Sequence, residues 1–169
     1  MKNHSANGRL HIGVFGRKGV GKSCLVQMLA GKSTFPVIGE FAAAFNPVYA
    51  WAEIPTVGPV VLIDTAGIDE DSTLLDKTKE VIERIQLALL IFDNETDFRL
   101  ESVWERKLKQ RHIPVIGVIN KIDERYVDIE PLLLAFDFPF VKVSATKRLN
   151  AGSLCEVIRN QTAAGHGVV

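Results

Sequence analysis

The chain has little of what marks secreted, membrane-spanning or metal-sulfur proteins. Its 169 residues contain two cysteines, Cys24 and Cys155, and no Cys-x-x-Cys pair or Cys/His cluster. Such a chain offers no disulfide framework and no sulfur-ligated metal site, so we expect two reduced, buried thiols. No apolar run reaches the roughly 18 residues of a membrane span, and residues 1–9 lack the apolar stretch of a signal peptide. These absences predict a cytoplasmic protein without a membrane partner.

Net charge is absent as well. The 20 Lys and Arg residues balance 20 Asp and Glu residues, so the formal net charge is zero. A neutral chain has no long-range field that would hold DNA, RNA or an anionic membrane surface. We therefore expect no nucleic-acid partner. A role at the ribosome or on tRNA stays open as a disfavoured alternative, which RNA binding in about 200 mM salt would support.

The chain does contain a regular alternation of short apolar runs and helical patterns. The runs predict strands at 10–16, 47–54, 59–64, 87–92, 113–119 and 140–143. Helices are expected at 23–31, 74–85, 101–111, 129–136 and 152–161. Continuous Val/Ile/Leu runs between helices indicate strands that are buried on both faces. The fold is therefore predicted to be α/β, with a six-stranded, mostly parallel sheet, one antiparallel edge strand at 47–54 and helices on both faces.

One domain is expected to contain all of these elements. The length suits a single domain, and 47% of the residues are apolar, which is enough for a substantial core. We expect an N-terminal extension at 1–9, the α/β domain at 10–161 and a flexible tail at 162–169.

The segment GRKGVGKS follows the first strand and opens the first helix. It matches the phosphate-loop pattern GxxxxGK(S/T) in the strand–helix context that this pattern requires. Its glycines let backbone N–H groups surround a phosphate, and the helix N-terminus attracts the same anion. Lys22 is expected to be the catalytic residue that bridges β- and γ-phosphates, and the Ser23 hydroxyl to ligate Mg²⁺. The nucleotide-binding residues predicted here are Gly16, Lys18, Gly19, Val20, Gly21, Lys22, Ser23 and Cys24.

A second motif, VVLIDTAG, ends the strand at 59–64. Its acidic residue, Asp64, is placed to hold Mg²⁺ through a water, so Ser23 and Asp64 are the predicted metal residues. Gly67 is expected to bring its N–H close to a γ-phosphate, which would let the following loop respond to that group.

Two further motifs are typical of guanine recognition. In NKID, Asp123 can accept hydrogen bonds from guanine N1–H and N2–H₂, a donor pair that adenine lacks. Asn120 is expected at the N7 side of the purine, and the Lys121 stem over the base plane. In VSAT, the Ala145 N–H is expected to donate to guanine O6, with Ser144 and Thr146 beside it.

The four motifs follow one another along the chain, and each lies at the carboxyl end of a predicted strand. Open α/β sheets bind their ligands at this edge. The sequence therefore predicts a Ras-like P-loop G domain that binds GTP and GDP with Mg²⁺ and hydrolyses GTP.

Two longer segments resemble one family in particular. NPVYAWAEIPTVGPVVLIDTAGIDED at 46–71 and KTKEVIERIQLALLIFD at 77–93 resemble the GTPase domain of the FeFe-hydrogenase maturation factor family, HydF. This family lies within the translation-factor-class P-loop GTPases, which include Era and MnmE. The resemblance implies a switch in hydrogenase cofactor assembly, with that machinery or further dimerisation and iron–sulfur domains as partners.

The chain departs from the resembled family at two places. Gly19 stands where the family has an asparagine, which in relatives such as MnmE helps to hold a K⁺ ion that supports hydrolysis. The segment Gly39–Val48 lacks the threonine that closes over Mg²⁺, and Thr34 is the alternative hydroxyl upstream. A third feature is shared with the resembled family. Ile68 occupies the position of the water-orienting glutamine of Ras-like switches, and an apolar side chain cannot orient a water.

These departures lead us to expect slow hydrolysis. The rival interpretation is a guanine-nucleotide-binding regulatory module with negligible hydrolysis. The loop between Lys32 and Asn46 is rich in apolar residues, and either packs on its own domain or forms a surface for a partner. Association of two copies of the chain as a homodimer is therefore one of the alternatives for this loop.

Overall fold

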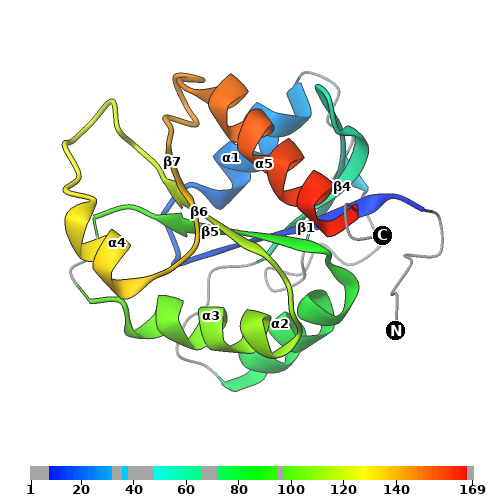
Figure 1. The fold of residues 1–169 in the computed structure, drawn as a ribbon, viewed down its shortest axis with the longest axis horizontal. Helices are drawn as coiled ribbons and strands as arrows, with labels where there is room; N and C mark the ends of the chain where they lie inside the picture. The colour runs from blue at the N-terminus through cyan, green and yellow to red at the C-terminus, as the bar shows by residue number, and fades with distance from the viewer. Residues whose placement is uncertain (1–7, 32–35, 38–47, 66–71, 95–96, 167–169) are drawn as a thin grey trace.

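The computed structural model describes residues 8–31, 36–37, 48–65, 72–94 and 97–166 (Figure 1). Several residues with predicted roles lie outside these ranges, among them Thr34, the loop at 39–47, Gly67 and Ile68. Their roles remain predictions. No helix in the described ranges is both long enough and apolar enough to cross a membrane.

One sheet forms the centre of the domain. Its described strands are β1 (Leu10–Gly16), β2 (Pro36–Val37), β3 (Val48–Ile54), β4 (Gly58–Asp64), β5 (Leu87–Phe92), β6 (Val115–Ile119) and β7 (Phe140–Lys142). The strand order is β2-β3-β4-β1-β5-β6-β7. β3 pairs antiparallel with both of its neighbours, and the other pairs are parallel. The six predicted strands and the single reversed strand are confirmed, and the two-residue strand β2 adds to them outside β3.

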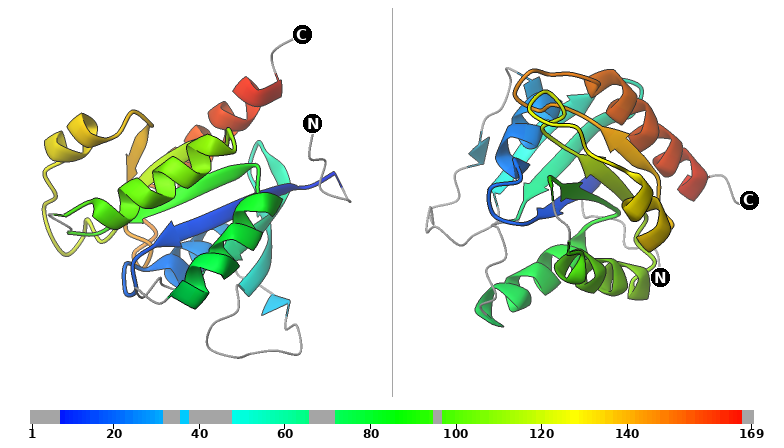
Figure 2. Two further views of the ribbon diagram at one scale, coloured as in Figure 1. Left: turned by 90° about the horizontal axis from the view of Figure 1, so that it is seen from below. Right: turned by 90° about the vertical axis from the view of Figure 1, so that its left-hand side faces the viewer.

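Helices cover both faces of this sheet, as predicted. Their bounds are α1 (Lys22–Ala30), α2 (Ser72–Arg84), α3 (Arg99–Gln110), α4 (Glu130–Ala135) and α5 (Ala151–His166). Figures 1 and 2 show α1 and α5 on one side of the sheet and α2 and α3 on the other. The short helix α4 lies beside the β6 and β7 end of the sheet.

The central strand β5 shows why the sheet has this form. All six of its residues are buried. Leu87, Leu89 and Ile91 belong to the core under α1 and α5, and Ala88, Leu90 and Phe92 belong to the core under α2 and α3. A strand covered on both faces needs an apolar side chain at every position, which is why its sequence is a continuous apolar run.

Five phenylalanines fill the space between α3, α4 and β7. The ring of Phe92 at the end of β5 lies 5.4 Å from that of Phe136 and 5.6 Å from that of Phe140. The Phe98 ring lies 5.9 Å from that of Phe136, and Phe138 stacks on Phe136 at 5.1 Å. Such contacts are favourable beyond the burial of the rings. The cluster supports the carboxyl edge of the sheet from the α3 side.

The structure corrects three details of the sequence prediction. Helix α5 runs to His166 rather than Gln161, so residues 162–166 of the expected flexible tail are helical. Cys24 is exposed and Cys155 is half-buried, so the expectation of two buried thiols is wrong, although both are free thiols as expected. β3 is not the edge strand that the sequence predicted, because the short strand β2 pairs with its outer side.

We expect the truncation Leu90→Ala to lower the free energy of unfolding by about 2–5 kcal/mol, because it leaves a cavity in the middle of the sheet. Leu90 is fully buried in β5. The matched control is Leu134→Ala on α4, where the side chain is 84% exposed and the change should stay within about 0.5 kcal/mol. Urea unfolding of both variants measures this, and equal effects would contradict the described core.

Candidate nucleotide-binding site

The loop after β1 has a backbone conformation that depends on glycine. Gly19 and Gly21 have φ values of 82° and 99°, which residues with a Cβ rarely adopt. A Cβ on Gly21 would also collide with the side-chain amide of Asn120, whereas a Cβ on Gly19 would meet no atom within 4 Å. The loop therefore needs glycine at 21 for both conformation and space, and at 19 for conformation alone.

Side chains hold the carbonyl groups of this loop. The Lys22 ammonium donates to the carbonyl oxygens of Gly16 at 3.0 Å and Arg17 at 2.9 Å. Two further donors come from the segment after β6. Lys121 Nζ lies 2.8 Å from the Gly19 carbonyl oxygen, and Asn120 Nδ2 lies 2.8 Å from that of Val20. These four contacts set the directions of the peptide groups that would face a phosphate.

Lys22 and Asp64 are charged groups in a largely buried position. Lys22 is 7% exposed, and burial lowers the pKa of its ammonium, an effect that nearby Asp64 partly offsets. Burial likewise raises the pKa of Asp64, while the hydrogen bond from Ser23 and the charge of Lys22 act in the opposite direction. Both side chains thus bear a desolvation cost in the nucleotide-free protein.

The two predicted metal residues lie together. The Ser23 hydroxyl at the start of α1 donates to Asp64 Oδ2 at the end of β4, over 2.6 Å. Hydroxyl and carboxylate oxygens are the donors that Mg²⁺ prefers, so this pair fits such an ion. Within the ranges that the structure describes, no group of three or more His, Cys, Asp or Glu side chains could hold a metal.

Asn120 connects three of the predicted loops. Its Nδ2 donates to Val20 in the first loop, and its Oδ1 accepts from the Ala145 N–H at 3.0 Å in the last. The side chain is 3% exposed. A backbone bond from Ile122 N–H to the Val143 carbonyl, 3.3 Å, joins the same segments. The structure thus gives Asn120 and the Ala145 N–H a role between loops that the sequence analysis did not foresee.

The remaining guanine-site residues differ in exposure. Asp123 and Thr146 are exposed, whereas Ser144 is fully buried. Lys121 adopts a positive φ of 62°, a rare conformation that clusters at functional sites. Its ammonium also pairs with Asp93 at 3.0 Å. Of the other predicted residues, Lys18 in the loop and Cys24 directly after it are exposed, and Gly67 lies outside the described residues.

Three residues of this region escaped the sequence analysis. Thr65 is buried and its Oγ1 donates to the Val14 carbonyl at 2.6 Å, which fixes the end of β4 against β1. Arg17 and Glu101 form an ion pair with a Nε–Oε1 distance of 2.7 Å. Arg17 stands at a variable position of the motif, and Glu101 follows it by 84 residues. No local pattern marks either residue.

The family comparison agrees with this geometry. A model of 50S ribosome-binding GTPases matches residues 11–121, which is more than half of the chain. The chain belongs to this GTPase family. The match includes the loop after β1, Asp64, Asn120 and Lys121, and it ends before Asp123.

Individual relatives agree with the family. GTPase Era of Halothermothrix orenii is 29% identical over 161 residues, which cover 87% of this chain and 53% of Era. tRNA modification GTPase MnmE of Chromobacterium violaceum is 30% identical over 121 residues, 68% of this chain and 26% of MnmE. A crystal structure of Aquifex aeolicus Era bound to GDP.AlF4⁻ has a TM-score of 0.71 at 26% identity, over 89% of this chain and 56% of Era.

These relatives confirm a Ras-like, GTP-binding GTPase domain of the Era and MnmE type. The chain spans about half the length of Era and about a quarter of MnmE. The more specific resemblance to hydrogenase maturation factors stays a prediction.

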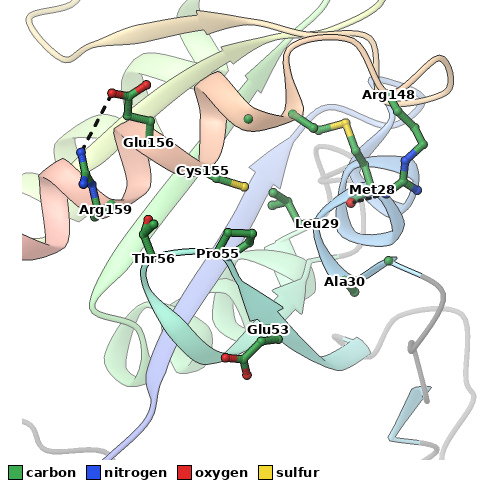
Figure 3. Close-up of a pocket in the computed structure, with 13 residues that line it drawn as sticks. Met28, Leu29, Ala30, Glu53, Pro55, Thr56, Arg148, Cys155, Glu156 and Arg159 are labelled. Atoms are coloured by element: carbon green, nitrogen blue, oxygen red, sulfur yellow. Dashed lines mark hydrogen bonds and ion pairs between the residues drawn. The ribbon is translucent and has the colours of Figure 1, made fainter.

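This GTPase domain has a hollow away from the motifs. A cavity of about 530 Å³ lies between the end of α1, the β3–β4 turn and the first turns of α5 (Figure 3). Arg148 at its rim donates to the Met28 carbonyl at 3.3 Å, and burial raises the pKa of the Cys155 thiol in its wall. None of the predicted nucleotide-binding residues lines it.

We expect Asn120→Ala to destabilise the nucleotide-free domain by about 2–4 kcal/mol, because it leaves the Val20 carbonyl and the Ala145 N–H without their partner. The control is Asn160→Ala on the exposed side of α5, which should change stability by less than about 0.5 kcal/mol. Thermal or urea unfolding measures both. Unchanged stability of Asn120→Ala would show that the loops do not depend on this side chain.

We also expect Asp64→Asn to stabilise the nucleotide-free domain near pH 7.5. Folding raises the pKa of Asp64, so the ionised carboxylate weakens the fold above that pKa and no longer does so below it. The asparagine removes this cost and still accepts from Ser23. Urea unfolding in EDTA should show an advantage over wild type that shrinks as the pH falls through the raised pKa. An advantage that grows at low pH would contradict the assignment.

Proposed function

We propose that this domain binds GTP and GDP with Mg²⁺ at the carboxyl edge of its sheet and hydrolyses GTP slowly, as a nucleotide-dependent switch. The observation that supports it most is the link through Asn120. This side chain holds the phosphate loop at Val20 and the last loop at Ala145 in one arrangement. A phosphate site and a base site are thereby kept at a constant separation, which a nucleotide requires.

The phosphate end of the proposed site uses Lys22, Ser23 and Asp64. Lys22 exchanges its two carbonyl acceptors for β- and γ-phosphate oxygens, which is favourable for a buried ammonium. Ser23 would hold Mg²⁺ through its hydroxyl, and Asp64 would hold it through a water. When bound, Mg²⁺ neutralises charge that develops on the phosphates. Gly16, Lys18, Gly19, Val20, Gly21 and Cys24 complete this end, and Gly67 contributes from the loop after β4.

The base end of the proposed site relies on Asp123. Its exposed carboxylate is available to accept from guanine N1–H and N2–H₂. The Lys121 stem covers the base plane while its ammonium keeps the contact with Gly19. Because the Ala145 N–H already donates to Asn120, its donation to guanine O6 must be shared between the two acceptors. Ser144 and Thr146 shape the same loop.

Slow turnover follows from what the sequence has near the γ-phosphate. Ile68 replaces a residue that would orient the attacking water, and Ala42–Ala44 stand where a metal-closing threonine is expected. Gly19 lacks the side-chain oxygen that would help to hold K⁺. The same three features favour the second candidate function, a regulatory module that binds guanine nucleotide with negligible hydrolysis.

The cellular role that we propose is hydrogenase cofactor maturation, in the cytoplasm. It rests on the resemblance of residues 46–71 and 77–93 to the HydF family. The output would be read by further domains, by the maturation machinery or by a second copy of the chain. The alternative is an RNA-associated role, since one solved Era structure contains MgGDPNP and nucleotides 1506–1542 of 16S ribosomal RNA. Hydrogenase maturation genes beside the coding sequence would support the first role.

The proposed activity is tested by GTP turnover of the purified chain with Mg²⁺, in K⁺ and in Na⁺ buffer. We expect turnover above that of Lys22→Ala, because truncation of Lys22 removes the charge that stabilises the transferring phosphoryl group. We expect the same rate in both buffers, because Gly19 provides no ligand for K⁺.

The outcomes separate the two candidate functions. Turnover above the Lys22→Ala blank supports the enzyme, and a faster rate in K⁺ would show that the ion is held without an asparagine. Tight GTP binding with turnover equal to the blank would leave the regulatory module. Absence of binding to either GTP or GDP would reject both.

A further inference from the structure

Glu101 is a fully buried carboxylate on α3, at 0% exposure. Both of its oxygens accept from one guanidinium. Arg17 Nε lies 2.7 Å from Oε1, and Arg17 Nη2 lies 3.0 Å from Oε2. A buried carboxylate is tolerated only with such a partner, and the two-pronged geometry fixes where that partner lies.

Arg17 is itself part of the phosphate loop. Its Nη2 also donates to the Asp97 carbonyl at 2.6 Å, just before α3 begins. Its own carbonyl oxygen accepts from Lys22 Nζ at 2.9 Å and from the Val20 N–H at 3.3 Å. Arg17 thus contacts the start of α3 through its guanidinium and the Lys22 ammonium through its carbonyl group.

The sheet explains why these segments meet. β1 pairs with β5, and Gly16 lies opposite Ile91. Arg17 follows β1 directly, and the segment that leads into α3 follows β5. The ion pair therefore forms at the point where neighbouring parallel strands both end. Glu101 holds the Arg17 side chain from the α3 side, whereas Lys22 contacts its backbone.

We propose that Glu101 is a positioning residue for the nucleotide phosphates and acts through Arg17. When Lys22 turns from the Arg17 carbonyl to a phosphate, that peptide loses one of its contacts. The guanidinium, held by Glu101 and the Asp97 carbonyl, keeps the peptide in place. Without Glu101, the loop would have to be ordered on binding, and ordering lowers affinity. This inference rests on the proposed nucleotide site.

A purely structural role predicts a different result. Glu101 would then only stabilise the fold. A variant that still folds would bind every guanine ligand with unchanged affinity, or would lose affinity for all of them to the same extent. A positioning role acts on the phosphate loop alone. Its effect falls on ligands that carry phosphates and spares guanosine, which contacts only the base end. The ratio of GDP affinity to guanosine affinity distinguishes the two.

The test compares Glu101→Gln, Arg17→Ala and the double variant of the full chain, by calorimetry with GDP and competition with guanosine. We expect Glu101→Gln to weaken GDP binding by about tenfold, within the range for residues that act through another, and guanosine by less than about twofold. The double variant should bind GDP about as weakly as Arg17→Ala alone, because both changes break one interaction.

The matched control is Glu105→Gln, one turn further along α3. Glu105 is half-buried and pairs with Lys109 at 3.0 Å, away from the loop. The Glu105→Gln variant should bind GDP as the wild-type chain does. If Glu101→Gln does not fold, Arg17→Lys replaces it. This variant keeps the charge but loses the two-pronged contact, and it should show the same selective loss for GDP.

The results that overturn the inference are specific. GDP affinity unchanged in a folded Glu101→Gln or Arg17→Lys variant rejects the positioning role, as does an equal loss for GDP and guanosine. Additive losses of GDP affinity in the double variant reject the inference that Glu101 acts through Arg17. Failure of the wild-type chain to bind GDP rejects the proposed function itself, and the inference with it.

Discussion

Side-chain hydrogen bonds to the backbone carbonyl groups of the loop after β1 organise this site. The loop after β1 turns four carbonyl groups toward protein, at Gly16, Arg17, Gly19 and Val20, and each receives a hydrogen bond from a lysine or asparagine side chain. A buried carbonyl group, such as that of Val20, would cost free energy comparable to a lost hydrogen bond if it were left unpaired. The donors come from α1 and from the segment after β6, so the phosphate loop and the predicted base loop depend on each other for their shape.

The charged groups at this edge of the sheet lower the stability of the nucleotide-free fold. Burial acts against the charged forms of both Lys22 and Asp64. Their mutual attraction offsets only part of that effect, since the net shifts follow burial. A ligand that brings phosphate oxygens to Lys22 and a cation to Asp64 would supply each with a better partner. Such a ligand stabilises the folded state, because it binds that state alone.

Much of the fold was predictable because its signals are local. The strands at 10–16 and 87–92 agree with β1 and β5 residue for residue, since a continuous apolar run between helices has few other interpretations. The end of α5 was missed. Thr162 and Ala163 continue the helix, Ala is the best helix former, and the Thr162 hydroxyl donates to the Arg159 carbonyl within the last turns. The sequence did not predict strand β2, because two residues are too few to show a strand pattern.

The sequence by itself determined which residues form the phosphate loop, because Gly16–Ser23 are contiguous and the motif requires only a strand before it and a helix after it. It also determined that Asp64 and Asn120 lie at the carboxyl ends of two of the strands. Only the tertiary structure decided that Asn120 links two loops, with partners 100 and 25 residues away, and that Glu101 holds Arg17 across 84 residues. Those pairings depend on the strand order, which places β1 beside β5 and β5 beside β6, and no short stretch of sequence encodes that order.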